Sequence, residues 1–272
     1  MKVLITGENG YIARSLENYL MLKGIGCDLV SLRNGIDTLN FDGYSSVVHC
    51  AAIVHRNKEN ISSEEYDRVN YELTVRLAQR ALENGADHFV FLSTMSVYGM
   101  ASGVITKDTP LNPTTEYGRS KLKAENALKN IEGLKCAVVR PPLVYGKGCR
   151  GNFVTLEKLS RVSRFFPLIT GKKSFIYIDN LCDGIYKIIS DKKEGLFLPQ
   201  NKEYSTASDI IYALREARGK KTTLLKGCGR LVMSVKIPIF IKAFGTLYYD
   251  EECRSCWGEI DFKKSIERTV EK

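Results

Sequence analysis

The chain has 272 residues, of which 44% are apolar, and its formal net charge is +9. This composition excludes a disordered chain, and no apolar run reaches the ~20 residues that a membrane-spanning helix needs. The basic residues are spread along the chain without an interleaved aromatic stripe, so nucleic acid is not an expected partner.

The apolar pattern begins at the third residue, so we expect no signal peptide, and the eight cysteines are then reduced thiols of a cytoplasmic protein. Cys253 and Cys256 form a single Cys-x-x-Cys pair without a second pair, so we expect no metal site. Residues 231–244 are strongly apolar but are interrupted by Lys236 and Pro238. We expect a helix with a proline break there, with a shallow contact at a membrane surface as the alternative.

The first predicted unit is a strand over Val3–Thr6, a glycine turn, and a helix that runs to Lys23. The turn has the pattern T-G-x-x-G-x-x-A, in which Gly7 lets the chain turn and Gly10 lets the backbone approach a ligand closely. The small side chain of Ala13 lets the helix pack on the strand. Because backbone N–H groups and the positive end of such a helix attract a pyrophosphate, this segment predicts a dinucleotide site.

The next predicted strand is Asp28–Leu32. Only a short stretch separates Arg33 from the following strand, Ser46–His49, so the helix that usually stands there is expected to be missing. Any third strand near Ile36–Leu39 is expected to be brief. A long helix is predicted over Ser63–Asn84.

Three further elements complete the predicted sheet. They are the strand His88–Leu92, a helix over Thr115–Leu128, and the strand Cys136–Arg140. Strands that alternate with helices predict an α/β fold with a doubly wound parallel sheet, whose ligand lies at the carboxyl ends of the strands.

The segments that carry chemistry follow two of these elements. Ser93 and Thr94 come directly after a buried strand, and Tyr117 and Lys121 stand four apart on a helix, so that they project from one face. This set suits reversible hydride transfer, in which the Tyr handles the proton of a substrate hydroxyl or carbonyl. We expect the Lys ammonium and a cationic nicotinamide to lower the Tyr pKa, and the Thr hydroxyl to bind the same substrate oxygen.

Six segments together resemble the extended short-chain dehydrogenase/reductase family, the nucleotide-sugar epimerases, dehydratases and reductases. The resemblance covers nearly the whole chain, and its later segments are more like the bacterial branch of UDP-sugar 4-epimerases and 4-ketoreductases. The six segments are Thr6–Ala13, Val47–Ala52, Ser93–Gly99, Tyr117–Lys121, Arg140–Gly146 and Phe175–Leu181.

The resemblance implies a Rossmann domain over residues 1–146, to which 176–197 return, and a small interleaved C-terminal substrate-binding region at 147–175 and 198–272. Its catalytic residues would be Thr94, Tyr117 and Lys121. The cofactor-binding residues would be Gly7, Asn9, Gly10, Tyr11, Ile12, Arg33, Asp37, Thr38, Ala51, Ala52, Ile53, Asn70, Ser93, Tyr117, Lys121 and Pro141. The substrate-binding residues would be Thr94, Met95, Tyr117, Asn152 and Lys173, and His55 could reach the substrate side.

The chain departs from the family pattern at two informative positions. Arg33 stands where NAD-binding members carry an acid, and an Arg there suits the 2′-phosphate of NADP; the alternative is NAD with Arg33 in solvent. Lys173 stands where galactose epimerases carry a phosphate-binding Arg, so it keeps the charge without the bidentate fork.

These features favour an NADPH-dependent 4-ketoreductase that acts at C4 of a nucleotide-linked hexose, with UDP as the expected nucleotide. A UDP-sugar 4-epimerase with tightly bound NAD is the alternative, since it would use the same residues. A non-catalytic NADP-binding regulator is a third, weaker hypothesis. The resemblance is also compatible with a homodimer.

Overall fold

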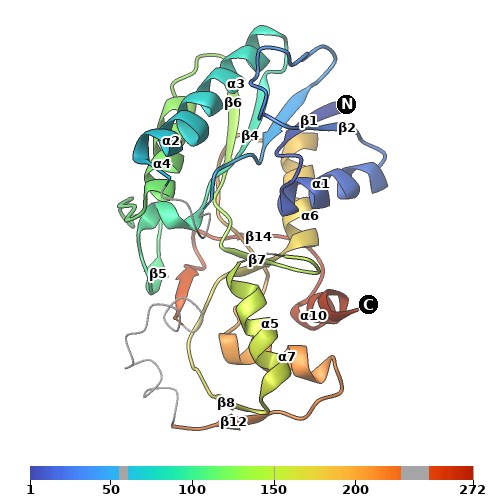
Figure 1. Ribbon diagram of the computed structural model, residues 1–272, viewed down its shortest axis with the longest axis vertical. Coiled ribbons are helices and arrows are strands. Elements are labelled where there is room, and N and C mark those ends of the chain that lie inside the picture. Colours follow the sequence, from blue (N-terminus) through green and yellow to red (C-terminus); the bar gives the residue numbers. More distant parts are fainter. Residues whose placement is uncertain (55–60, 150, 228–244, 272) are drawn as a thin grey trace. The chain divides into compact units, whose positions relative to one another are not determined.

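The computed structural model describes residues 1–54, 61–149, 151–227 and 245–271 (Figure 1). His55 and the apolar stretch 231–244 therefore lie outside the described residues. The chain divides into two compact units, each taken here by itself. Unit 1 comprises Met1–Gly99, Pro110–Pro141 and Cys182–Phe197, and unit 2 comprises Met100–Thr109, Pro142–Leu181 and Leu198–Lys272.

Unit 1 is built on a parallel sheet of six strands in the order β10-β6-β4-β3-β1-β2, which confirms the predicted doubly wound α/β class. Its central strands are fully buried because helices cover both faces, with α1 and α6 on one face and α3 and α4 on the other (Figure 1). The strands are β1 (Lys2–Thr6), β2 (Gly26–Val30), β3 (Ser46–His49), β4 (His88–Leu92), β6 (Lys135–Val139) and β10 (Gly195–Phe197).

The helices of unit 1 follow the predicted order. They are α1 (Tyr11–Leu22), α2 (Ser63–Asp67), the π-helical turn η1 (Arg68–Glu72), α3 (Leu73–Glu83), the 3-10 turn η2 (Met95–Tyr98) and α4 (Glu116–Leu128). The long helix predicted over Ser63–Asn84 thus contains one π-helical turn. A wider turn of this kind often marks a functional site, because it re-aims one side chain.

The stretch between β2 and β3 contains no helix in the described residues, as predicted, and no strand forms near Ile36–Leu39, where any strand was expected to be brief. A turn stands there instead. Ile36 is fully buried in the apolar cluster that also contains Phe41 and Leu77, so its side chain packs into the core from a turn rather than from a strand. The chain then crosses from β2 back past β1 to β3, and the carboxyl ends of strands at such a reversal are where parallel α/β sheets bind their ligands.

Unit 2 consists of short strand pairs and helices. The helix α6 (Ile178–Ser190) starts in unit 2 and continues into unit 1. Tyr145 is fully buried, stacks on Phe153, and shares a hydrogen bond of 2.6 Å with the hydroxyl of Ser265. The pairs are β5 (Gly103–Ile105) with β13 (Leu247–Tyr249), β7 (Leu143–Tyr145) with β9 (Phe175–Tyr177), β8 (Phe165–Pro167) with β12 (Thr223–Leu225), and β11 (Pro199–Gln200) with β14 (Ser255–Cys256); the other helices are α5 (Asn152–Val162), α7 (Ala207–Glu216) and α10 (Phe262–Val270).

Candidate active site

The turn after β1 leaves no room for side chains at its two glycines. Gly7 has a φ of +98°, and a Cβ there would lie 3.0 Å from the backbone nitrogen of Ala51. A Cβ on Gly10 would lie 2.9 Å from the carbonyl oxygen of Gly7. The Gly7 N–H donates to the Val30 carbonyl at 2.9 Å, so the turn is also tied to the end of β2. Both glycines are therefore needed for this shape.

The helix that follows this turn offers its first N–H groups to a ligand. Its N-cap is Gly10, no side chain caps it, and its first turn carries no acidic residue. A helix start of this kind holds a partial positive charge and unsatisfied donors, which suit a pyrophosphate. Ala13 is fully buried, as expected for the residue that packs the helix on the sheet. The cradle formed by Gly7 and Gly10 thus fits a dinucleotide.

The loop after β2 carries the residues predicted to bind the adenosine end. Arg33, Asp37 and Thr38 are all exposed. The Asp37 carboxylate accepts hydrogen bonds from Arg76 at 3.2 Å and Arg80 at 3.3 Å, and Arg80 also donates to the Asp37 carbonyl. These contacts tie the loop to α3 and pair the Asp37 carboxylate with two arginines. Arg33, by contrast, presents its side chain to solvent directly after β2.

A chain of hydrogen bonds joins the loop after β3 to the start of α4. Asn70, fully buried in the π-helical turn, accepts from the Ile53 N–H at 2.8 Å and donates to the Ile53 carbonyl at 3.0 Å. Its amide also donates to Ser120 at 3.1 Å, and Ser120 donates to the Tyr117 carbonyl at 3.0 Å. These bonds fix the distance between the Ala51–Ile53 loop and the helix that carries Tyr117.

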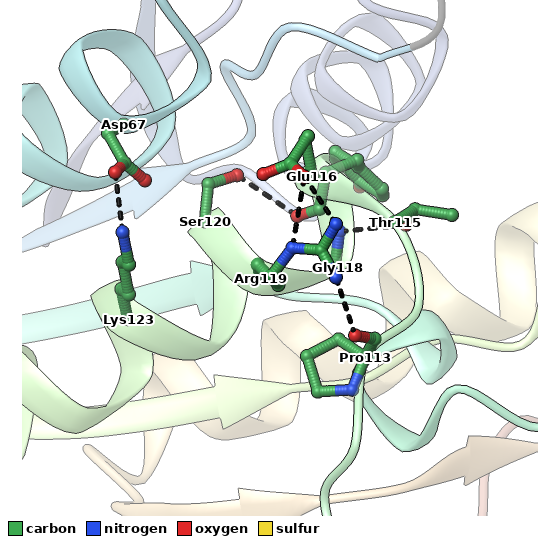
Figure 2. A network of polar contacts seen from close by, with 9 residues as sticks. Asp67, Pro113, Thr115, Glu116, Gly118, Arg119, Ser120 and Lys123 are labelled. Carbon is green, nitrogen blue, oxygen red and sulfur yellow. Dashed lines mark hydrogen bonds and ion pairs between the residues drawn. The ribbon is translucent and has the colours of Figure 1, made fainter. Parts of the chain in front are cut away.

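The first turn of α4 is fixed by its own polar contacts, shown in Figure 2. The Thr115 hydroxyl caps the helix by accepting from the Gly118 N–H at 3.1 Å. Arg119 pairs with Glu116 and donates to the Pro113 carbonyl at 3.3 Å. A capped and cross-linked first turn gives the adjacent Tyr117 little backbone freedom.

Thr94 and Tyr117 meet through their hydroxyl groups. Thr94 is the N-cap of η2, directly after β4, and its side chain is hydrogen-bonded to Tyr117. Burial raises the pKa of Tyr117 to about 12, while the hydrogen bond with Thr94 lowers it in part. The surrounding residues thus keep the phenol protonated at neutral pH, and the expected lowering of its pKa refers to the enzyme with a cationic nicotinamide bound beside Lys121.

Lys121 is fully buried one turn after Tyr117. Its ammonium donates to the Leu92 carbonyl at 2.8 Å and lies 4.4 Å from the centre of the Phe91 ring. Burial lowers the pKa of Lys121 to about 8, because the ammonium loses its hydrating water and the surrounding side chains compensate that loss only in part. The side chain is thus anchored at the carboxyl end of β4, beside Ser93.

A buried ion pair that the sequence analysis missed lies under this site. Glu125 and Arg140 are both almost completely buried, and the guanidinium binds the carboxylate through two nitrogens. Ser93 donates its hydroxyl proton to Glu125, so toward any ligand Ser93 can only accept a hydrogen bond. Arg140 also donates to the Tyr98 hydroxyl at 2.8 Å. The available signal was spacing: Tyr117, Lys121 and Glu125 follow one another at four-residue intervals on one helix face.

The remaining predicted residues are placed as follows. The Met95 N–H donates to the Pro141 carbonyl at 3.2 Å, which joins the segment after Thr94 to the end of β6. Lys173 belongs to unit 2, where it is 9% exposed and burial lowers its pKa to about 8. Asn152 starts α5 in the same unit, and its side chain lies outside the described part of the structure.

Two further features concern the residues that the structure describes. No helix in those ranges is long and apolar enough to cross a membrane. Over the same ranges, no group of three or more His, Cys, Asp or Glu side chains could hold a metal ion.

A parallel sheet with a pyrophosphate turn after β1, and with Thr, Tyr and Lys gathered at the end of β4, defines the short-chain dehydrogenase/reductase class. The model of the NAD-dependent epimerase/dehydratase family matches residues 3–197. The chain belongs to this family, which makes it an enzyme of the extended, NAD(P)-binding branch that contains nucleotide-sugar epimerases and reductases.

Individual relatives agree with this assignment. The UDP-glucose 4-epimerase of Vibrio cholerae is 30% identical over 90% of this chain and 82% of its own. The UDP-2-acetamido-2,6-beta-L-arabino-hexul-4-ose reductase of Pseudomonas aeruginosa is 27% identical over 84% of this chain and 62% of its own. The crystal structure of UDP-N-acetylglucosamine 4-epimerase from Bacillus cereus has the same fold, with a TM-score of 0.76, 19% identity, and coverage of 98% of this chain and 97% of that one.

Proposed function

We propose that this enzyme is an NADPH-dependent 4-ketoreductase that acts on a nucleotide-linked hexose, with UDP as the nucleotide. The observation that carries the proposal is the hydroxyl pair of Thr94 and Tyr117 at the end of β4, with Lys121 anchored at the same strand end. A protonated phenol can donate the proton that ketone reduction needs, and the choice of a reductase over an epimerase is carried by Arg33, which suits NADPH as an exchangeable cofactor.

In this mechanism the cofactor supplies the hydride to C4, and the side chains of unit 1 manage the proton and the geometry. Tyr117 donates its proton to the C4 oxygen, and Thr94 holds the same oxygen by a hydrogen bond. Lys121, held at the Leu92 carbonyl, places a positive charge beside the reaction and the nicotinamide ribose. Asn70 fixes the Ala51–Ile53 loop, which would line the cofactor.

NADPH is the proposed cofactor because of the charges at the end of β2. Arg33 is exposed there, no acidic residue stands within residues 29–36, and Asp37 is engaged by Arg76 and Arg80. A guanidinium can pair with a 2′-phosphate, whereas a carboxylate at this point would repel it. NAD, with Arg33 in solvent, is the alternative.

On the substrate side we propose that Lys173 and Asn152 bind the diphosphate and that Met95 contacts the sugar. Support comes from the position of Lys173, which is 9% exposed in unit 2 and takes the place of a phosphate-binding Arg in the family pattern. We expect Lys173→Met to raise KM for the nucleotide sugar more than KM for the cofactor. Lys172→Met is the matched control, since the exposed neighbour Lys172 pairs with Glu251. If Lys173→Met instead raised KM for the cofactor more than KM for the nucleotide sugar, Lys173 would not be the residue that binds the diphosphate of the substrate.

A 4-epimerase is the second candidate, and the Vibrio cholerae relative favours it. An epimerase would retain its cofactor, oxidise C4 and return the hydride to the other face, with the same Thr94, Tyr117 and Lys121. The two candidates therefore differ in whether the cofactor is exchanged or kept.

The purified enzyme distinguishes the candidates. A reductase consumes added NADPH with a UDP-linked 4-ketohexose and is isolated without nicotinamide absorbance. An epimerase carries tightly bound NAD(H) and interconverts two UDP-hexoses without added cofactor. Binding of NADPH with no turnover of either substrate would favour the non-catalytic regulator. Light scattering on the same preparation tests for the homodimer.

A further inference from the structure

The β8–β12 ribbon of unit 2 has an unusual outer face. Phe165 pairs with Thr223 and Pro167 with Leu225, so these four side chains share one face, while Phe166 points to the buried side. Phe165 is 49% exposed and Leu225 is 39% exposed. Val162, at the end of α5 just before the ribbon, is 81% exposed. Large apolar side chains thus cluster in solvent here.

The same part of the chain carries most of the protein's net charge. Residues 157–168 and 212–227 contain eight basic and two acidic side chains, a net charge of +6 out of the +9 of the whole chain. The basic side chains are Lys158, Arg161, Arg164, Arg215, Arg218, Lys220, Lys221 and Lys226. A concentration of one sign around exposed apolar groups raises the local potential for an anionic partner.

Contacts within unit 2 hold these charges around the ribbon. The Thr223 N–H donates to the Arg164 carbonyl at 2.8 Å, and the Arg164 guanidinium lies 4.6 Å from the centre of the Phe165 ring. The buried Arg215 donates to the Lys221 carbonyl at 2.7 Å, which fixes the turn that leads into β12. The Arg164 cation and the Phe165 ring therefore share one surface, and the turn that carries Lys221 is held next to it in the chain.

The acidic residues of this region do little to neutralise it. Glu157 is shared by two cations, Arg161 at 2.7 Å and Arg218 at 2.8 Å. Three exposed lysines, at positions 220, 221 and 226, flank β12 in the chain, and Arg164 covers the Phe165 ring. A second copy of this surface would bring like charges together, so the partner is expected to be anionic.

We propose that the outer face of β8–β12 docks on an anionic lipid surface, with Phe165, Leu225 and Val162 in the interfacial layer and the surrounding cations at the phosphates. Apolar side chains ringed by Lys and Arg suit this environment, because the acyl boundary accepts the former and the headgroups the latter. A nucleic acid would use the charges but would leave the aliphatic side chains in water. The inference goes beyond the proposed reaction and does not depend on it.

The test is sedimentation of the full chain with lipid vesicles. Vesicles of phosphatidylcholine containing phosphatidylglycerol are compared with vesicles of phosphatidylcholine alone, at low and high salt. The charge variant is Arg164→Glu/Lys226→Glu, and the apolar variant is Phe165→Ser. The matched control is Lys263→Glu/Lys264→Glu, which makes the same change of charge on α10, at the other end of this unit in Figure 1.

We expect binding to the anionic vesicles only, weakened by salt and weakened roughly tenfold or more by the charge variant. Phe165→Ser should weaken it several-fold without any change of charge, and the α10 control should bind like wild type. The proposal is overturned if anionic vesicles do not sediment the protein, or if the control loses binding equally. It also fails if Phe165→Ser lowers the melting temperature and leaves vesicle binding intact, because the face would then serve internal packing.

Discussion

The catalytic end and the adenosine end of unit 1 are built in opposite ways. At the catalytic end, Lys121, Glu125 and Arg140 are buried, and each has a hydrogen-bonded partner inside the unit. At the adenosine end, Arg33 and Asp37 are exposed on a turn that replaces the usual helix. The catalytic end therefore holds its side chains in one fixed arrangement, whereas the adenosine end presents its side chains to solvent.

This difference separates two properties of the enzyme. Buried groups with mutual hydrogen bonds tolerate little change, because removal of one partner leaves the other uncompensated. Exposed groups can be exchanged at small cost to the fold. We therefore expect the proton chemistry to be fixed by several residues acting together, and the choice between NADP and NAD to depend on one or two side chains.

The largest expected effect is at Tyr117. Tyr117→Phe removes the proton donor while the ring still packs, so turnover should fall by about 10²–10⁴-fold with little change in cofactor affinity. Turnover is measured with NADPH and a UDP-linked 4-ketohexose, and affinity by fluorescence titration. Near-full turnover in the variant would remove Tyr117 from the mechanism and favour the non-catalytic hypothesis.

The next effect concerns the buried pair below Ser93. Arg140→Leu should lower the free energy of unfolding by about 3–5 kcal/mol, because it leaves the Glu125 carboxylate charged and unpaired. The double variant Glu125→Leu/Arg140→Leu should recover a large part of that loss, since both charges are removed together. Urea unfolding gives both values. If the double variant is less stable than the single one, the charge is not the cause.

A smaller effect is expected at the exposed end. Pairing of Arg33 with a 2′-phosphate is worth roughly 1.5–3 kcal/mol, so NADPH should bind at least about tenfold more tightly than NADH. Arg33→Asp should reverse the order, and Arg33→Lys, which keeps the charge, should retain a weaker preference. Dissociation constants at moderate salt provide the measurement, and equal values for the wild-type enzyme would refute the assignment.

The parts that could be predicted from sequence depend on local spacing. Glycine geometry predicts the turn at Gly7 and Gly10, and the spacing of apolar residues predicts the order of strands and helices. Both signals can be read from residues that are close together in the sequence. The missing helix after β2 followed from length alone. No strand forms in the described segment near Ile36–Leu39, because Ile36 reaches the apolar core from a turn.

The parts that could not be predicted depend on residues distant in sequence. Glu125 extends the spacing of Tyr117 and Lys121, yet nothing local shows that its partner is Arg140, fifteen residues later on another element. The pKa of Tyr117 is a sum of burial and hydrogen bonding, so its direction needs the packed surroundings. Spacing identified the residues but not their electrostatic environment.

The smallest expected effect is on stability at Lys121, and it tests whether burial at the catalytic end is costly. The folded protein lowers the Lys121 pKa from 10.5 to about 8, so folding favours the neutral amine. Below pH 8 the charged form is held in the fold at a cost of roughly 3 kcal/mol, part of which the bond to the Leu92 carbonyl offsets, so Lys121→Met should then be more stable than wild type by about 1–2 kcal/mol. As pH rises from 8 to 10.5 this cost disappears, so the free energy of unfolding of the wild type should rise relative to that of the variant. Lys123 lies on the same helix as Lys121 but is exposed and pairs with Asp67 of α2, so Lys123→Met should show no such gain. Urea unfolding across this pH range measures both differences. A Lys121→Met variant that is less stable than wild type at neutral pH would mean that the bond to the Leu92 carbonyl outweighs the cost of burying the charge.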